Sequence, residues 1–250
     1  MTVDARLGAI AAAQPYPLVF ATVSGAHLYG FESADSDFDL RGVHVLPVRE
    51  VIGLDQGPET IQVAELRDGL DLDLVTHDVG KFASLLLRHN GYVLEQLYSP
   101  LVVSGGVLHE ELKALGSGCI TRNHAHHYLG FSETQWRLYD KTHQLKPLLY
   151  TFRVLKTGIH LMRTGRVEAN LVHLLDDEPR IAYLDGLIAD KQAHGEHATV
   201  TGGHGADFGA DVARLREVLA AEREASRLPG TTEGRPALHD FVVRARLGPS

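Results

Sequence analysis

Residues 25–30 read Gly-Ala-His-Leu-Tyr-Gly, and residues 35–43 read Asp-Ser-Asp-Phe-Asp-Leu-Arg-Gly-Val. Asp37 and Asp39 are two positions apart, so an extended strand directs both carboxylates to one face and Phe38 to the other. Two anions held side by side attract a cation. This stretch therefore predicts a β-strand with a candidate cation site directly after a glycine-flanked turn.

The run that precedes this turn, residues 18–23, is short, apolar and rich in residues that favour strands. We expect it to be a buried strand that leads into the turn. Glycines in such a turn let backbone N–H groups approach a ligand closely, and a series of these groups can bind phosphate. Phosphate binding beside paired carboxylates suggests a metal-bound nucleoside triphosphate.

Gly25, Gly30, Ser36 and the pair Arg41-Gly42 extend this pattern around the two aspartates. Together they resemble the signature of the DNA polymerase β-like nucleotidyltransferase superfamily, and most closely its RNA-repair-pathway polymerase β-like family. The resemblance is strongest over residues 19–100 and covers most of the chain. It implies an α/β (α+β) fold, in which a nucleotidyltransferase core with a mixed sheet is followed by a helical C-terminal half.

The resemblance also implies roles for individual residues. Asp37 and Asp39 would be catalytic metal ligands, and the nucleotide would be bound around Gly25, Ala26, Gly30 and Ser36. The family usually has a serine where this chain has Ala26, so one hydroxyl contact to the triphosphate is missing. Either Ser24 substitutes for it, or the activity is weakened or altered.

A third carboxylate is expected from residues 70–75, where leucines alternate with Asp71 and Asp73. The family places its third acidic residue at a fixed distance before a Lys-Phe pair that opens a helix. Counting back from Lys81-Phe82 gives Asp73, with Asp71 as the fallback. The alternative is an edge strand whose charged face is simply solvated.

Composition limits the class of protein. The 250 residues are 44% hydrophobic, which is enough for a sizeable core, and the formal net charge of −8 disfavours wrapping nucleic acid over the whole surface. Cys119 is the single cysteine, which excludes an internal disulfide and a cysteine-cluster zinc site. Because we find no apolar run of membrane-spanning length and no signal-peptide pattern, we expect a cytoplasmic protein with no membrane partner.

The chain after residue 108 has helical periodicity, with helices expected over about 121–139, 147–163 and 211–227. Pro147 and Gly165 match the usual start and stop signals of a helix. In the first part, helices are expected over 4–13 and 79–89. We therefore expect a catalytic domain over residues 1–105 and a helical domain over residues 106–250.

The helix after Pro147 carries a basic stripe of Arg153, Lys156, His160 and Arg163. Such a stripe is usually a solvated face, but it can also contact triphosphate or a nucleic-acid backbone. The superfamily resemblance implies a basic residue from the helical half that faces the active site. Lys146 and Arg153 best fit this pattern.

Histidine is abundant, and residues 122–127 read Arg-Asn-His-Ala-His-His. The spacing from Arg122 to His127 mimics the RNase motif of HEPN domains, but this motif is short and the surrounding pattern resembles the helical half of the nucleotidyltransferase family. Zinc binding by His124 and His127 lacks an identified third ligand. The Gly- and His-rich residues 194–209 are expected to form a loop and not a phosphate-binding loop, because no strand leads into them.

The sequence thus predicts a two-metal, NTP-dependent nucleotidyltransferase that uses Asp37, Asp39 and Asp73 to bind Mg²⁺ (or Mn²⁺). It would transfer a nucleoside monophosphate to an acceptor hydroxyl and release pyrophosphate. The family resemblance implies an RNA end as the acceptor, while a protein side chain or a small molecule stays open. The competing hypothesis is a weak or inactive nucleotide-binding regulator, such as an antitoxin-like partner, which Ala26 would mark.

Overall fold

The computed structural model describes residues 4–67, 69–200 and 207–248. The chain forms two compact units. Unit 1 contains the residues up to Gly25, Asp37–Ile120 and those from Thr232 onward, and unit 2 contains Ala26–Ser36 and Thr121–Thr231. These units differ from the expected segments 1–105 and 106–250, because the last helix returns to unit 1 and residues 26–36 join unit 2.

A five-stranded mixed sheet forms the centre of unit 1, in the order β3-β4-β2-β1-β5. β2 and β4 are parallel, whereas the other neighbouring strands are antiparallel. The mixed α/β fold predicted from the sequence is therefore confirmed. The strands are β1 (Leu18–Val23), β2 (Phe38–His44), β3 (Thr60–Arg67), β4 (Leu70–Asp78) and β5 (Val102–Ser104).

The segment between β2 and β4 is more ordered than the sequence suggested. A short helix, α3 (Arg49–Ile52), precedes β3, and neither element was predicted from the sequence. β3 has exposed residues on both faces, so it lacks the alternating apolar pattern that identifies a half-buried strand. β4 also extends beyond residue 75, because Thr76 and His77 remain paired with both neighbouring strands and Asp78 with β2.

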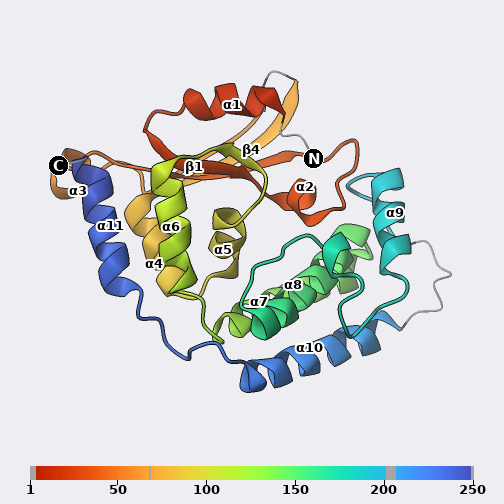
Figure 1. The fold of residues 1–250 in the computed structure, drawn as a ribbon. Helices are drawn as coiled ribbons and strands as arrows, with labels where there is room; N and C mark the ends of the chain where they lie inside the picture. Colours follow the sequence, from red (N-terminus) through yellow and green to blue (C-terminus); the bar gives the residue numbers. More distant parts are fainter. Residues whose placement is uncertain (1–3, 68, 201–206, 249–250) are drawn as a thin grey trace. The chain divides into compact units, whose positions relative to one another are not determined.

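One face of this sheet is covered by α1 (Ala5–Ala12), as Figure 1 shows. Asp4 caps this helix, because its carboxylate accepts a hydrogen bond from the backbone N–H of Arg6. The buried side chains of α1 pack against alternate residues of β1, β2 and β4. This cluster consists of Leu7, Ile10, Ala11, Ala21, Val23, Leu40, Leu70, Leu72 and Leu74, with Phe38 packed beside it.

The opposite face is covered by α4 (Val79–Leu87), α5 (Gly91–Leu97) and α6 (Val107–Ser117), and α11 (Arg235–Leu247) packs against α4 and α6 (Figure 1). The core on this side contains Phe20, whose ring meets Phe82 edge-on and stacks on His109 at a centroid distance of 4.5 Å. The central strands β1 and β2 are thus covered on both faces, and the residues of the parallel pair β2 and β4 have fixed directions.

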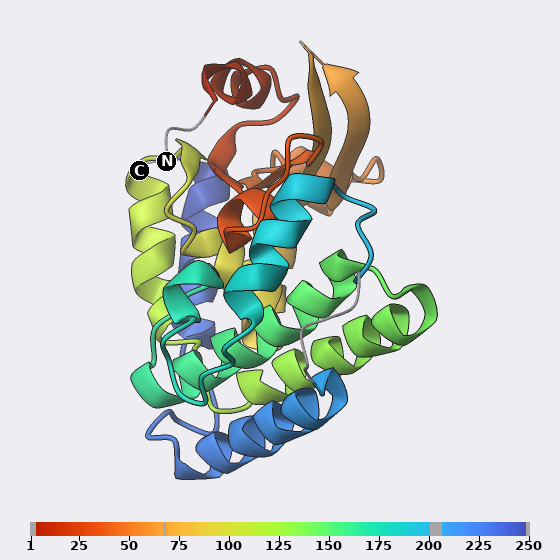
Figure 2. The same cartoon turned by 90° about the vertical axis from the view of Figure 1, so that its right-hand side faces the viewer.

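Unit 2 is helical. Its elements are the short α2 (Gly25–Tyr29), which starts at the last residue of a unit 1 segment, α7 (His124–Thr142), α8 (Leu145–Thr164), the 3₁₀ turn η1 (Val172–Leu174), α9 (Leu184–His194) and α10 (Phe208–Ala225). α8 is buried along most of its length and packs against α7 and α10, which lie beside it in Figures 1 and 2.

The bounds of these helices differ slightly from the expected ones. α7 begins and ends three residues later than predicted, and α8 begins at Leu145, two residues before Pro147. Proline is tolerated there because the first N–H groups of a helix have no partner within it. α8 ends at Thr164, one residue later than predicted and directly before Gly165, which has a φ of 69°. No helix among the described residues is both long enough and apolar enough to cross a membrane.

α11 is fixed to the sheet by an ion pair of low exposure. Arg246 donates two hydrogen bonds to the carboxylate of Asp78, at 2.6 and 3.0 Å, and one to the carbonyl of Leu46. Asp78 ends β4 and caps α4 through Gly80 N–H. Burial raises the pKa of Asp78, but the hydrogen bonds from Arg246, Leu46 and Gly80 outweigh it, so the pKa lies below its ordinary value.

We expect Arg246→Ala to lower the free energy of unfolding by about 3 kcal/mol, because it leaves the charge of Asp78 unpaired in a buried position. Denaturant unfolding followed by circular dichroism measures this. The matched control is Arg244→Ala, which removes an exposed ion pair with Glu111 and should cost less than about 1 kcal/mol. Equal losses in the two variants would contradict the structural role given to Arg246.

Candidate active site

Three aspartates of unit 1 converge on the sheet face opposite α1. One carboxylate oxygen from each of Asp37, Asp39 and Asp73 lies within 4.8 Å of the others. Asp39 and Asp73 are direct partners in the parallel pairing of β2 with β4, and Asp37 immediately precedes β2. The i, i+2 spacing has the predicted effect, because Phe38 points to the α1 side.

The donor set suits a hard divalent cation. All the converging atoms are carboxylate oxygens, which are the ligands that Mg²⁺ and Mn²⁺ prefer. Oδ1 of Asp73 is buried without a hydrogen-bond partner, and buried polar atoms normally have one. Across the described parts of the chain, this is the one group of three or more His, Cys, Asp or Glu side chains with metal-binding geometry. Asp71, the fallback, is exposed and outside the group.

Arg41 is a member of this cluster that the sequence reasoning gave no role. Its Nη2 atom lies 2.5 Å from Asp39 Oδ1 and 2.8 Å from Asp73 Oδ2, and its Nη1 atom donates to the backbone carbonyl of Asp73. The guanidinium therefore bridges the two strands and offsets part of the negative charge. The period of two along β2 places Arg41 on the same face as Asp39, which is the signal that could have identified it.

Gly25 makes room for Asp39. It has a φ of +60°, and a Cβ atom at this position would lie 1.6 Å from Oδ2 of Asp39. The backbone N–H of the preceding Ser24 donates to the carbonyl of Asp39 at 2.8 Å, which holds the two segments together. The expected glycine turn is in fact the start of α2, because the backbone after Gly25 closes into one helical turn. Ala26 is buried there with no hydroxyl to offer.

Gly30 also makes room for a neighbouring side chain. Its φ is +84°, and a Cβ atom would lie 2.3 Å from Oδ1 of Asn170. That oxygen accepts the N–H of Val172, and the N–H of Leu171 donates to the carbonyl of Tyr29. In unit 2, Gly30 thus lets the segment before η1 pack closely against the end of α2.

Ser36 and Lys146, both expected to bind nucleotide, meet at the carboxylate of Glu196. Ser36 donates to Oε1 at 2.6 Å, and Lys146 Nζ lies 2.6 Å from Oε2. Lys191, which is fully buried, contacts Oε1 at 2.8 Å and donates to Ser33 Oγ at 2.7 Å. The sequence gave no signal for Glu196 or Lys191, because these contacts link Glu196 to Ser36 across 160 positions.

This cluster holds Glu196 in its charged form. Burial raises the pKa of its carboxyl group. The hydrogen bonds from Lys146, Lys191 and Ser36 lower this pKa by more than burial raises it, so its value is about 2. Ser36, Lys146 and Lys191 therefore surround this carboxylate with hydrogen-bond donors, an arrangement that favours binding of an anion.

The residues of the basic stripe of α8 contact other residues of unit 2. Arg153 is fully buried, with its guanidinium carbon 3.6 Å from the centroid of the Tyr29 ring. Lys156 is also buried, donates to the carbonyl of Asp177, and has its pKa lowered to about 8 by burial. The solvated-face interpretation is wrong for these two residues, because aromatic rings and the segment around Asp177 cover them. His160 and Arg163 pair with Asp177 and Glu222.

Two histidines of the cluster, His124 and His127, pack within the helical unit. His124 is buried and its Nδ1 contacts the backbone of Thr121. The ring of His127 stacks parallel to Phe131, and burial, together with the charge of Arg153, lowers its pKa to about 4. Within the described ranges no third ligand joins these histidines. Of the Gly- and His-rich segment, residues 201–206 lie outside the described residues.

A mixed sheet that presents three aspartates on one face is the architecture that the sequence resemblance implied, and it defines a polymerase β-like nucleotidyltransferase. The sequence matches the RNA repair pathway DNA polymerase beta family (RlaP) over residues 1–244, and the chain belongs to this family.

Two individual proteins illustrate the relationship. The chain is 29% identical over 176 residues to the uncharacterized protein MJ0002 of Methanocaldococcus jannaschii, an alignment that covers 66% of this chain and 70% of that protein. Among solved structures, it is similar to a nucleotidyltransferase-like protein from Exiguobacterium sibiricum, with 12% identity and a TM-score of 0.35. That comparison covers 98% of this chain and 80% of the other.

We expect Gly25→Ala to weaken Mn²⁺ binding by at least about tenfold, because the added methyl group displaces the carboxylate of Asp39. Calorimetric titration with Mn²⁺ measures this. Gly8→Ala, in α1, is the matched control, since nothing lies within 4 Å of the added Cβ. Unchanged Mn²⁺ affinity in a folded Gly25→Ala variant would show that Asp39 does not ligate the ion.

We expect Glu196→Gln to destabilise unit 2 in a pH-dependent way. The folded pKa of about 2 lies below the ordinary 4.5, so the stabilisation is fully present above pH 4.5 and is lost as the pH falls toward 2. The difference in unfolding free energy between wild type and variant should therefore be smaller at pH 3 than at pH 6. Fluorescence of Trp136, the single tryptophan, reports unfolding of α7.

The control for this measurement is Glu224→Gln, on α10, whose side chain is 70% exposed. It should show little change in stability at either pH. A Glu196→Gln difference that is the same at both values would mean that the lysines do not lower the pKa of Glu196.

Proposed function

We propose that this protein is a metal-dependent nucleotidyltransferase that moves a nucleoside monophosphate from an NTP to the hydroxyl of an RNA end. The observation that supports it most directly is the convergence of Asp37, Asp39 and Asp73, with Asp73 Oδ1 buried and unpartnered. The family name agrees with RNA as the acceptor.

In this proposal the three aspartates hold one or two Mg²⁺ (or Mn²⁺) ions. When bound, such ions neutralise the phosphate oxygens and lower the pKa of the attacking hydroxyl. Asp73 would also accept the proton of that hydroxyl, and its Oδ1 atom, which has no hydrogen-bond partner, supports this role. Arg41 already contacts the other oxygen of Asp73, so it orients this carboxylate toward the ligand.

We further propose that Lys146 and Ser36 bind the triphosphate, as the family pattern implies. Support comes from the carboxylate of Glu196, which occupies the donors of both residues in the way that a phosphate oxygen would. Roles of Gly25, Ala26, Gly30 and Arg153 in nucleotide binding remain predictions. Their observed contacts are with Asp39, the core, Asn170 and Tyr29, respectively.

The experiment incubates the protein with each labelled NTP, Mg²⁺ or Mn²⁺, and an RNA oligonucleotide that has a 3′-hydroxyl. We expect label to be transferred to the RNA and pyrophosphate to be released. Asp37→Asn/Asp39→Asn should reduce transfer to background. Asp71→Asn is the matched control, because it removes an exposed carboxylate two residues from Asp73 and should leave transfer unchanged.

Two observations favour a nucleotide-binding regulator as the second candidate function. Ala26 lacks the hydroxyl that the family uses, and Arg41 forms ion pairs with Asp39 and Asp73, two of the three carboxylates that a metal ion would need. The same experiment separates the two functions. Tight NTP binding without transfer to RNA, to protein or to small-molecule hydroxyls would support the regulator and contradict the enzyme.

A further inference from the structure

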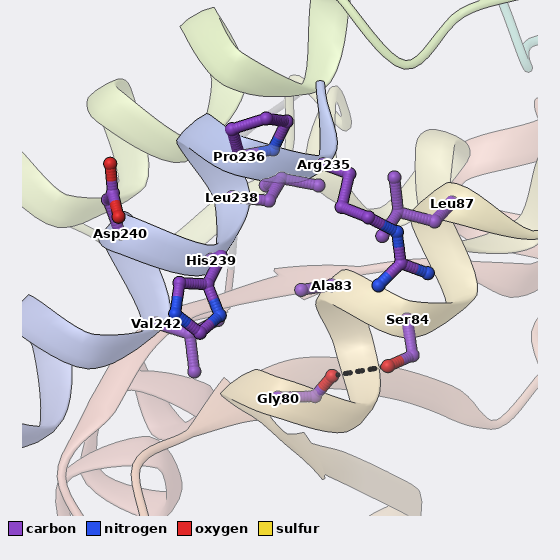
Figure 3. Close-up of a pocket in the computed structure, with 10 residues that line it drawn as sticks. All are labelled: Gly80, Ala83, Ser84, Leu87, Arg235, Pro236, Leu238, His239, Asp240 and Val242. Carbon is purple, nitrogen blue, oxygen red and sulfur yellow. Dashed lines mark hydrogen bonds between the residues drawn. The ribbon is translucent and has the colours of Figure 1, made fainter. Parts of the chain in front are cut away.

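A groove in unit 1 lies between α4 and α11, outside the acidic cluster. It has a volume of about 500 Å³ and is lined by Gly80, Ala83, Ser84, Leu87, Arg235, Pro236, Leu238, His239, Asp240 and Val242 (Figure 3). Small-molecule sites in proteins have volumes of about 300–1,000 Å³. The groove is therefore large enough for a single nucleotide-sized ligand.

The groove combines an apolar floor with two cation-forming side chains. Ala83 and Leu238 are buried between the two helices and form part of the floor. Arg235 and His239 are one turn apart on α11, and Arg235 reaches toward Ser84 of α4 (Figure 3). Within the described residues, neither Arg235 nor His239 has a hydrogen-bond or ion-pair partner.

The charge of the groove is arranged asymmetrically. Asp240, the acidic residue among those that line the groove, extends on the other side of His239, away from Arg235 (Figure 3). Ser84 adds a hydroxyl that already donates to the carbonyl of Gly80 and can still accept. An arginine without a partner over an apolar floor matches a ligand that carries an anion on a flat, apolar body.

The frame of the groove is rigid. At one end of α11, Arg246 is bound to Asp78, the residue that caps α4, and Gly80 leaves room for this guanidinium. A Cβ atom at Gly80 would lie 3.0 Å from Arg246 Nη2. The two helices are thereby joined near Gly80, while the groove extends along them to Arg235. A preformed frame limits the ordering cost of binding.

We propose that this groove binds a nucleoside monophosphate unit, with its phosphate at Arg235 and His239 and its base on the apolar floor. The unit is either a free nucleotide or the 5′-phosphorylated terminal nucleotide of an RNA strand. This site uses none of the residues assigned to the metals or the triphosphate. Binding at it therefore requires neither metal ions nor the proposed transfer reaction.

The test measures affinity by calorimetry in EDTA and about 0.15 M salt, where weak surface charge effects are screened. The probes are AMP, adenosine, and an RNA oligonucleotide with either a 5′-phosphate or a 5′-hydroxyl. We expect AMP to bind more tightly than adenosine. If the source is RNA, the 5′-phosphorylated strand should bind more tightly than both AMP and the 5′-hydroxyl strand.

Arg235→Gln should weaken binding of the phosphorylated probe by at least about tenfold, the usual effect of losing a charged hydrogen bond. Arg235 is exposed, so the variant should fold normally, which its melting temperature checks. Arg244→Gln is the matched control, because it removes the same charge from α11 outside the groove and should leave affinity unchanged.

Three results would overturn the proposal. One is no binding of any phosphorylated probe up to about 1 mM. Another is an equal loss in Arg235→Gln and Arg244→Gln, which would mean that only net charge matters. The third is loss of binding in Asp37→Asn/Asp39→Asn in EDTA, which would place the ligand at the acidic cluster. Retained binding in that variant supports this site even if no nucleotide transfer is ever detected.

Discussion

The parallel pairing of β2 with β4 is the constraint on which the candidate site depends. It sets Asp39 opposite Asp73, so two carboxylates from different strands share one face of the sheet. Placing like charges this close is unfavourable unless a cation lies between them. In this structure Arg41 provides that cation. The packing of Phe38 and Leu40 against α1 prevents the strand from slipping by one residue, which would turn the aspartates away.

Much of the fold was predictable where the pattern of the sequence reflects burial on one side. The alternation in residues 70–75 identified β4, and the spacing of Asp37 and Asp39 correctly gave their shared face. β3 was missed because a strand with both faces exposed has no such alternation. The start of α8 was placed two residues too late, because Pro147 fits the third helical position as well as the first.

The side-chain contacts of Arg41 and Glu196 could not be predicted for a different reason. Arg41 reaches a neighbouring strand, and Glu196 gathers groups that are far apart in the sequence, so no local pattern encodes either contact. The basic stripe of α8 shows the reverse problem. Its spacing is typical of a solvated face, yet Arg153 lies over Tyr29 and Lys156 is covered by the segment around Asp177. A single sequence shows which residues share a helix face, but not what covers that face.

The return of α11 to unit 1 affects how the protein forms during synthesis. Arg246 and its partner Asp78 are separated by 168 positions, and all of unit 2 from Thr121 to Thr231 is made between them. At about 5–20 residues per second, the ribosome needs roughly 8–34 s to pass from one to the other. During this time α4 and α6 lack the helix that packs against them. A nascent chain would therefore expose the apolar surface under α11 until residues 235–247 have been made, which makes that surface a natural substrate for chaperones.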